Sequence, residues 1–478
     1  MMSFNIFDFF IYKWRYWIGY GIITVGLIAA LIFAGMYLPG GISHQEMQSV
    51  IKSNSLGLTS LFKSTDIVHL PYHLLQHVSL AIFGVSILSI KLPSIILAFL
   101  SAIGMVLLLR LWFKPGIAVL ASLIAITTGQ FIFIAQDGTP SILYLFWPVS
   151  LILLASLISS QKRFRMFYKM SFFIVAALSM YTPLNFYILI ALATAIILHP
   201  HLRFMIRQLS KKEIIASLVV AFLMLIPLIV ALLKAPSLAL TLLGIPSHWP
   251  TLSANFSSLG AQYLGFNRPS GTLLMTPFFE LGSMLIIAIG VYQLIQNRET
   301  AKGYVIGLWL LCLAPVIILN PNFTSISFLP LVLLLALGLK ALLSHWYELF
   351  PFNPYARIGG LIPVVILVAV LTLSGIDRYV HGYQYDPNIA PNFSMDLKLI
   401  PADTKNLVVS DNELAFYQVV SEHNKKPVVT TMPIAGENSF LATRQANQAF
   451  AGFRIDRIIT SPLSSDSDRF YLYTKITD

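Results

Sequence analysis

Residues 88–110 read LSIKLPSIILAFLSAIGMVLLLR, an apolar run long enough to cross a lipid bilayer as one helix. Lys91 and Arg110 lie near its two ends, where long cationic side chains can reach the membrane interface. Runs of comparable length occur at 17–39, 117–136, 140–160, 214–233, 274–296, 304–320, 324–344 and 358–376. This repetition predicts an α-helical polytopic membrane protein.

The composition agrees with a membrane protein. Hydrophobic residues make up 57% of the chain and charged residues only 11%, with a mean hydropathy of +0.77. Soluble domains carry about twice that share of charge. The net charge of +11 does not indicate nucleic acid as a partner, because the basic residues are spread between apolar runs. The single cysteine, Cys312, excludes a disulfide or a cysteine-based metal site within the chain.

The run at 170–199 is too long for one ordinary span and has basic segments on both sides, QKRFRMFYK (161–169) and HLRFMIRQLSKKE (201–213). Both flanks should be cytoplasmic by the positive-inside rule. We therefore expect a helical hairpin that turns at Thr182-Pro183; the alternative is one long tilted helix. With the hairpin there are about eleven spans, with a cytoplasmic N-terminus and an extracytoplasmic C-terminus. The first run has no small-residue cleavage site and should be a retained anchor.

Two domains are expected. Residues 1–376 form the polytopic membrane domain, with outer segments at 40–87 and 234–273. Residues 377–478 carry more charge and form a small soluble α/β domain on the outer side. Its expected elements are strands at 406–411, 426–432, 457–460 and 469–475 and helices at 413–423 and 438–451.

Few carboxylates of the membrane domain can face the outer side, and three of them are site candidates. Glu46 follows the first run in GGISHQEMQSV (40–50), Asp137 lies in QDGTP (136–140), and Glu280 is expected a turn or two inside its helix. Each has a structural alternative. Glu46 can close a capping box with Ser43 on an exposed surface helix, Asp137 can form a turn, and Glu280 can be a hydrogen-bonded structural acid.

The outer segments contribute histidine, basic and aromatic side chains. PYHLLQHVSLAIFG (71–84) has helical spacing, and places His73 and His77 on one face, either as metal ligands or as interfacial histidines. The second outer segment offers Lys234, Tyr263 and Arg268, a combination that suits a phosphate and a sugar ring. Arg268 can equally be an interfacial anchor.

Four short motifs carry a resemblance to a known family. They are His44-Gln45-Glu46-Met47, Leu70-Pro71-Tyr72-His73-Leu74-Leu75 leading to Phe83-Gly84, Lys91-Leu92-Pro93-Ser94, and Ala135-Gln136-Asp137-Gly138-Thr139-Pro140. Over residues 17–160 the chain resembles the integral-membrane glycosyltransferases of superfamily C (GT-C). The similar branch is that of protein mannosyltransferases and aminoarabinose transferases (glycosyltransferase family 39-like). The family's acidic pair corresponds here to Gln45-Glu46, so its first acid is a glutamine.

The resemblance implies transfer of a sugar from a polyprenyl-phosphate donor to a lipid, glycan or protein acceptor in the cell envelope. Glu46 and Asp137 are the expected catalytic carboxylates. Arg268, Lys91 and Lys234 are expected to bind the donor phosphate. The expected substrate-binding residues are His44, Gln45, Tyr72, His73, Tyr263 and Glu280. A bound divalent cation is the alternative source of positive charge for the leaving phosphate, and membrane lipids are the remaining partners.

Two other functions stay open at this point. A transporter of lipid-linked substrates would show internal repeats and broken helices in matching halves, whereas only one broken run is visible here. A non-catalytic scaffold that binds through its outer α/β domain is compatible with the glutamine at position 45.

Overall fold

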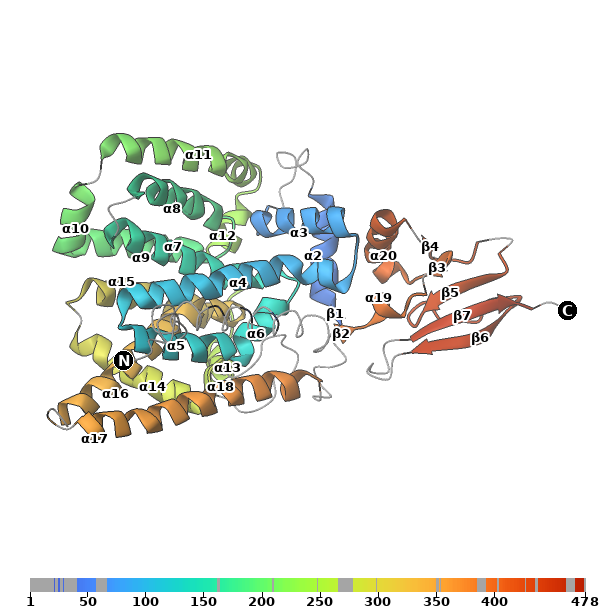
Figure 1. The fold of residues 1–478 in the computed structure, drawn as a ribbon. Coiled ribbons are helices and arrows are strands. Elements are labelled where there is room, and N and C mark those ends of the chain that lie inside the picture. Colours follow the sequence, from blue (N-terminus) through green and yellow to red (C-terminus); the bar gives the residue numbers. More distant parts are fainter. Residues whose placement is uncertain are drawn as a thin grey trace, which may run out of the picture.

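The computed structural model describes residues 21, 25, 29, 41–56, 67–160, 164–264, 278–384, 393–460 and 469–476. Within these ranges it leaves out positions 209, 247, 298, 350, 351, 353, 402, 403, 426, 435 and 436. A helical bundle forms most of the molecule, and a smaller α/β domain lies at one end of it (Figure 1). Most of the first apolar run lies outside the described residues.

Six described helical segments are long and apolar enough to cross a membrane. They are Ile87–Trp112 (α4), Pro140–Ser160 (η1 and α7), Lys211–Lys234 (α11), Ala301–Leu319 (α15), Pro321–Leu349 (η2 and α16) and Ile362–His381 within α18. The chain is therefore a multi-pass membrane protein. The number is at most eight if each of two bent pairs counts as one span, namely α5 with α6 (Pro115–Thr127 and Gly129–Gln136, 61°) and α9 with α10 (Asn185–Leu198 and Pro200–Arg207, 95°). Two shorter apolar helices are α8 (Arg165–Ser179) and α14 (Leu281–Gln296). The figure of eleven spans stays a prediction.

The run at 170–199 is broken where the sequence predicts. Helix α8 ends at Ser179 and α9 begins at Asn185. The break lies at the end of the bundle that holds the first outer segment, because the carbonyl of Tyr181 accepts the His69 N–H at 2.8 Å. The other ends of the hairpin meet at the opposite end, where Lys169 and His201 line one cavity. Both basic flanks thus lie at the same end, as the hairpin prediction requires.

Close helix packing at the centre depends on two glycines. A Cβ on Gly290 of α14 would lie 1.9 Å from the carbonyl oxygen of Leu334, and a Cβ on Gly338 of α16 would lie 2.0 Å from that of Ile286. Only glycine permits this approach of two backbones, a frequent feature of membrane helix pairs. The main apolar core of the bundle surrounds this contact.

The first outer segment forms two helices, α2 (His44–Ser55) and α3 (Leu70–Phe83), in agreement with the sequence. Ser43 caps α2 and closes a capping box with Glu46. Pro71 stands in the first turn of α3, where its missing N–H is not needed. The remaining helices of the membrane domain are α12 (Ser237–Leu242), α13 (Leu252–Leu264) and α17 (Pro354–Gly359).

The last membrane helix, α18 (Leu361–Gln384), runs past the domain boundary expected after residue 376. Asp377 and Arg378 interrupt the apolar pattern, but the helix continues because Tyr379 is buried against the bundle. The short strand β2 (Phe393–Ser394) then pairs antiparallel with β1 (Ile42–Ser43).

The α/β domain contains a five-stranded mixed sheet in the order β4-β3-β5-β7-β6. Its elements are α19 (Asp396–Leu399), β3 (Asn406–Val408), α20 (Asp411–Asn424), β4 (Val428–Thr430), β5 (Ser439–Thr443), β6 (Phe453–Thr460) and β7 (Arg469–Lys475). The helix expected at 438–451 is wrong. Residues 439–443 form the central strand instead, because Phe440, Leu441 and Ala442 are buried between β3 and β7.

The α/β domain packs on the first outer segment (Figure 1). Val85 and Ile87 share an apolar cluster with Phe416 and Val420 of α20. Asn424 binds the backbone of Val85 twice, accepting from its N–H at 2.8 Å and donating to its carbonyl at 2.9 Å. The domain and the outer segment therefore lie on the same side of the bundle.

Candidate active site

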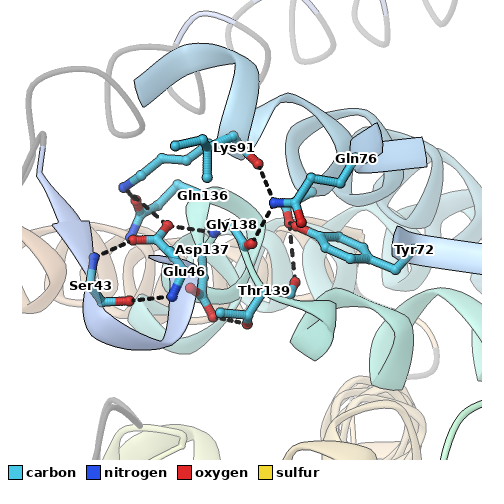
Figure 2. A network of polar contacts seen from close by, with 11 residues as sticks. Ser43, Glu46, Tyr72, Gln76, Lys91, Gln136, Asp137, Gly138 and Thr139 are labelled. Carbon is cyan, nitrogen blue, oxygen red and sulfur yellow. Dashed lines mark hydrogen bonds and ion pairs between the residues drawn. The ribbon is translucent and has the colours of Figure 1, made fainter. Parts of the chain in front are cut away.

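Glu46 lies at the centre of a buried polar network (Figure 2). Its helix, α2, is at the end of the bundle that faces the α/β domain (Figure 1). The Glu46 side chain is completely buried. One carboxylate oxygen, Oε2, accepts the Ser43 N–H at 2.7 Å, and the other, Oε1, accepts the Gly138 N–H at 2.6 Å. The capping box is thus confirmed, but the carboxylate is not an exposed surface charge. It joins α2 to the 137–139 turn, 92 positions further along the chain.

Lys91 compensates the charge of Glu46. Its Nζ lies 3.6 Å from Glu46 Oε1 and donates to Gln136 Oε1 at 2.7 Å, and all three side chains are fully buried. A buried carboxylate without a partner would be very costly, so this ion pair is what permits Glu46 to stay there. The Phe393 ring, from the segment that leads into the α/β domain, lies 6.0 Å from the Lys91 ammonium.

Asp137 is the second carboxylate of the site, directly beside the first. It is the C-cap residue of α6, and its side chain is 8% exposed. The Thr139 hydroxyl donates to its Oδ2. Burial, and to a smaller extent the nearby charge of Glu46, raise the pKa of Asp137 to about 7 against the opposing effects of Lys91 and of the hydrogen bonds from Thr139 and Ser141. Asp137 can therefore exchange a proton near neutral pH.

Gln76 fixes the 137–139 turn against three helices. Its amide nitrogen donates to the carbonyls of Ile90 at 3.1 Å and Gly138 at 3.0 Å. Its amide oxygen accepts from the hydroxyls of Ser49 at 2.8 Å and Ser53 at 2.6 Å. The side chain is completely buried, so every hydrogen bond of this amide is made inside the protein. In the sequence Gln76 is only a polar interruption of an apolar helix.

Tyr72 and His73 lie in the same region, and their polar atoms contact serine hydroxyls rather than the two carboxylates. The Tyr72 hydroxyl lies 2.9 Å from that of Ser94, and His73 Nδ1 lies 2.8 Å from the Ser53 hydroxyl. Both side chains are buried. Burial, with the charge of Lys52, lowers the pKa of His73 to about 3, so its ring is neutral at physiological pH.

The other expected site residues are not part of the network. His44 and Gln45 are exposed on the first turn of α2, and Lys234 is exposed at the end of α11. The Tyr263 hydroxyl lies 2.6 Å from that of Ser327, and its ring stacks on Phe278. Arg268 lies outside the described residues.

Glu280 is the residue before α14, so the expectation that it lies inside the helix is wrong; residues 278–280 are not helical. Partial burial raises its pKa, and a hydrogen bond with Ser374 and the charge of Arg378 oppose this. Arg378 is a cation at the end of α18 that sequence reasoning missed. Tyr379, next to it, is buried and interacts electrostatically with Glu46. An arginine following an apolar run was the available signal.

A divalent cation does not fit these residues. The oxygens of Glu46 face two backbone N–H groups and a lysine ammonium, all of which repel a cation. Within the part of the chain that the structure describes, His, Cys, Asp and Glu side chains form no group of three that would bind a metal. His73 and His77 both contact Ser53, through its hydroxyl and its carbonyl, rather than converging on one point.

Residues 70–230, about a third of the chain, match the family model "Dolichyl-phosphate-mannose-protein mannosyltransferase". The match covers α3 to α11 and therefore includes Gln76, Lys91 and Asp137. No curated protein matches the sequence significantly.

The fold is similar to that of solved membrane proteins. ArnT from Cupriavidus metallidurans, crystallised with undecaprenyl phosphate, aligns over 95% of this chain and 98% of its own, with 11% identity and a TM-score of 0.56. Its apo form gives 12% identity, the same coverage and a TM-score of 0.52. The oligosaccharyltransferase of Archaeoglobus fulgidus aligns over 84% of this chain and 64% of its own, with 12% identity and a TM-score of 0.47. The family match and the ArnT-like fold confirm the resemblance to GT-C glycosyltransferases drawn from the sequence.

Proposed function

We propose that this chain, a GT-C-type membrane protein, is a glycosyltransferase that moves a sugar from a polyprenyl-phosphate-linked donor to an acceptor hydroxyl at the outer face of the membrane. One observation carries the proposal. Glu46 and Asp137, from two segments far apart in the sequence, meet in one buried network through the Gly138 N–H. Carboxylates in a polytopic membrane protein are costly, and two together favour a functional site.

The two carboxylates have different surroundings, which supports different roles. Both oxygens of Glu46 accept backbone hydrogen bonds, and Lys91 neutralises its charge. Glu46 is therefore a positioning residue that holds the 137–139 turn. Asp137, slightly exposed and with a pKa of about 7, is the residue suited to act as base.

The reaction then follows from the position of Asp137. Its carboxylate takes the proton of the acceptor hydroxyl as that oxygen forms a bond to the anomeric carbon of the sugar. The bond from that carbon to the phosphate oxygen breaks, and the electron pair leaves with polyprenyl phosphate. The Lys91 ammonium has three N–H donors. It donates to Gln136 and faces Glu46, so one donor remains for the leaving phosphate.

The outer face is inferred from the charge distribution. The network lies at the end of the bundle opposite the cavity lined by Lys169, His201 and Lys302. Basic residues collect at the cytoplasmic end of membrane proteins, which supports an outer position for the network and the α/β domain. A glycosylation-sequon or protease-accessibility assay of the C-terminal residues in intact cells would test this orientation.

Transfer assays with membranes that contain the full chain test the function. The donors are polyprenyl-phosphate-linked mannose and aminoarabinose with a labelled sugar, and the product is any labelled lipid, glycan or protein. Asp137→Asn should reduce transfer by roughly 10²- to 10⁴-fold, because general-base catalysis contributes about that much. The matched control is Asp456→Asn, an exposed aspartate of β6.

Binding of undecaprenyl phosphate separates the alternatives. Asp137→Asn should still bind it, because the phosphate is not held by this carboxylate. Transfer that is unchanged in Asp137→Asn would disprove the base assignment. Binding of the lipid phosphate by the wild type with no transfer from either donor would favour the scaffold function instead.

A further inference from the structure

An apolar cavity of about 480 Å³ lies between the helices at the basic end of the bundle, opposite the candidate active site. Its walls come from the C-terminal parts of α4, α7 and α9, from α10, and from the N-terminal parts of α8, α11 and α15. Trp112, Phe172 and Leu192 are typical wall residues. Ser159 and His201 are exposed at its edge, so the cavity reaches the surface of the bundle.

Cationic side chains accompany these apolar walls. Lys302 lines the cavity, donates to the Trp112 carbonyl at 2.5 Å and keeps two further N–H groups. Lys340 is close enough to interact with Lys302 electrostatically. Lys169, also in the wall, is bound to Glu213. An anion beside Lys302 would relieve the repulsion between two lysines that share no acidic partner among the described residues.

Helix α10 covers one side of the cavity. It leaves α9 at 95°, as a helix that lies along a membrane surface rather than across it. Its Leu202 and Met205 line the cavity, while Arg203 and Arg207 are exposed. Lys211 and Lys212 follow directly, also exposed. The cavity is therefore apolar inside and has basic groups where it meets the membrane surface.

We propose that this cavity binds one anionic phospholipid of the surrounding bilayer, with an acyl chain between α7, α8 and α10 and the phosphate beside Lys302 and α10. A chain of hydrocarbon fits the walls, and basic pockets between membrane helices are typical sites for anionic head groups. The proposal does not depend on the proposed enzymatic function, since the cavity and the carboxylate network lie at opposite ends.

Quenching of Trp112 tests the proposal directly. The full-length protein in detergent is titrated with phosphatidylglycerol that carries a brominated acyl chain. Fluorescence of Trp112, obtained as the difference between wild type and Trp112→Phe, should be quenched. Excess unbrominated phosphatidylglycerol should restore it, at concentrations several-fold below those needed with phosphatidylcholine.

Two variants locate the site. Ala155→Phe fills the cavity and should abolish the quenching, whereas Ala216→Phe, the same change at an exposed position of α11, should not. Lys302→Met should weaken phosphatidylglycerol binding on the order of fivefold, as expected for one lost cation near an anionic lipid. Lys114→Met, an exposed lysine at the same end, is its control.

Three results would overturn the proposal. They are equal competition by phosphatidylglycerol and phosphatidylcholine, unchanged quenching in Ala155→Phe, and stronger competition by undecaprenyl phosphate than by phosphatidylglycerol, which would make the cavity a donor site. Since the comparison of lipids needs only the wild type and Trp112→Phe, a cavity or lysine variant that fails to fold does not remove the test.

Discussion

At the scale of single residues, the two carboxylates of the site differ in how many of their oxygens are engaged. Both oxygens of Glu46 accept backbone hydrogen bonds, from Ser43 and Gly138, and Lys91 pairs with its charge, which supports the positioning role proposed for it. Asp137 has hydrogen bonds only with the hydroxyls of Thr139 and Ser141 among the described contacts, and a small exposed fraction. We make three predictions about single side chains of this site.

The first prediction concerns pH. The folded-state pKa of Asp137, about 7, is raised above the usual value of an aspartate. Transfer that needs the ionised form should therefore rise about tenfold per pH unit below 7 and level off above it. A rate–pH profile at low substrate concentration measures this. A profile that is flat between pH 5.5 and 8 would exclude Asp137 as the base.

The raised pKa of Asp137 makes stability fall with rising pH, whereas it makes the transfer rate rise. Between the ordinary aspartate pKa and about 7, the unfolded chain loses the proton while the folded chain keeps it, so folding becomes less favourable as pH rises. Asp137→Asn removes this contribution. Its thermal midpoint should exceed that of the wild type at pH 8 and approach it at pH 4, as measured by tryptophan fluorescence in detergent.

Gln76 carries the third prediction. Gln76→Leu leaves the carbonyls of Ile90 and Gly138 without their donor and should destabilise the protein by about 2–4 kcal/mol. The substitution should lower the kcat of transfer more than it changes KM, because the turn that carries Asp137 is displaced. Gln48→Leu, an exposed change on α2, is the control. Unchanged kcat with lowered stability would restrict Gln76 to a purely structural role.

At the scale of elements, the turn between α6 and η1 brings the site together. A Cβ on Gly138 would lie 2.8 Å from Ile90 Cγ2 and 2.9 Å from Glu46 Oε1. Gly138→Ala should therefore separate Glu46 from the turn, reducing stability by about 1–3 kcal/mol and transfer by at least tenfold. Thermal midpoints and transfer rates of purified variants measure both effects.

A double variant sharpens this test. Ile90→Ala removes the contact with Ile90 Cγ2 but not those with Glu46 Oε1 and the Ile90 carbonyl oxygen, so it should restore Gly138→Ala only in part, if the clash is the cause. Gly116→Ala, where nothing lies within 4 Å of the new Cβ, is the matched control and should behave as wild type. Wild-type transfer by Gly138→Ala would show that the Glu46 contact is dispensable.

At the scale of the whole molecule, the α/β domain supports the site from outside. It contacts α2 through Asn54, which bonds to Glu422 and His423, and it contacts the start of α4 through Asn424. The β1–β2 pair joins Ser43, whose N–H binds Glu46, to Phe393. Weaker packing of the α/β domain on the bundle should therefore disturb the positions of the two carboxylates.

Asn424→Ala tests this connection. It removes both hydrogen bonds to the Val85 backbone, and the domain should become sensitive to limited proteolysis while the bundle stays intact. Transfer should fall several-fold. Asn412→Ala, exposed on the same helix, should change neither property. Loss of the intact domain with full transfer would show that the domain is not needed for the site.

Much of the architecture can be predicted from local sequence patterns. Apolar runs and basic flanks identify the helices and the break near Pro183, because a bilayer demands length and hydrophobicity from each segment separately. The capping box at Ser43 and the helix that contains Gln76 are equally local. The strand β5 was misjudged, since SFLAT has no alternation and its burial depends on neighbours on both sides.

The sequence by itself determined the class of protein, the order of its helices and the few carboxylates available for chemistry, since each of these depends on residue type and short-range spacing. Only the tertiary structure decided that Glu46 accepts two backbone hydrogen bonds while burial raises the pKa of Asp137. That distinction arises from partners 45 to 92 positions away, Lys91 with Gln136 and Gly138 with Glu46, which no local pattern records. Burial and charge neutralisation are properties of the folded surroundings, so they appear only when distant segments meet.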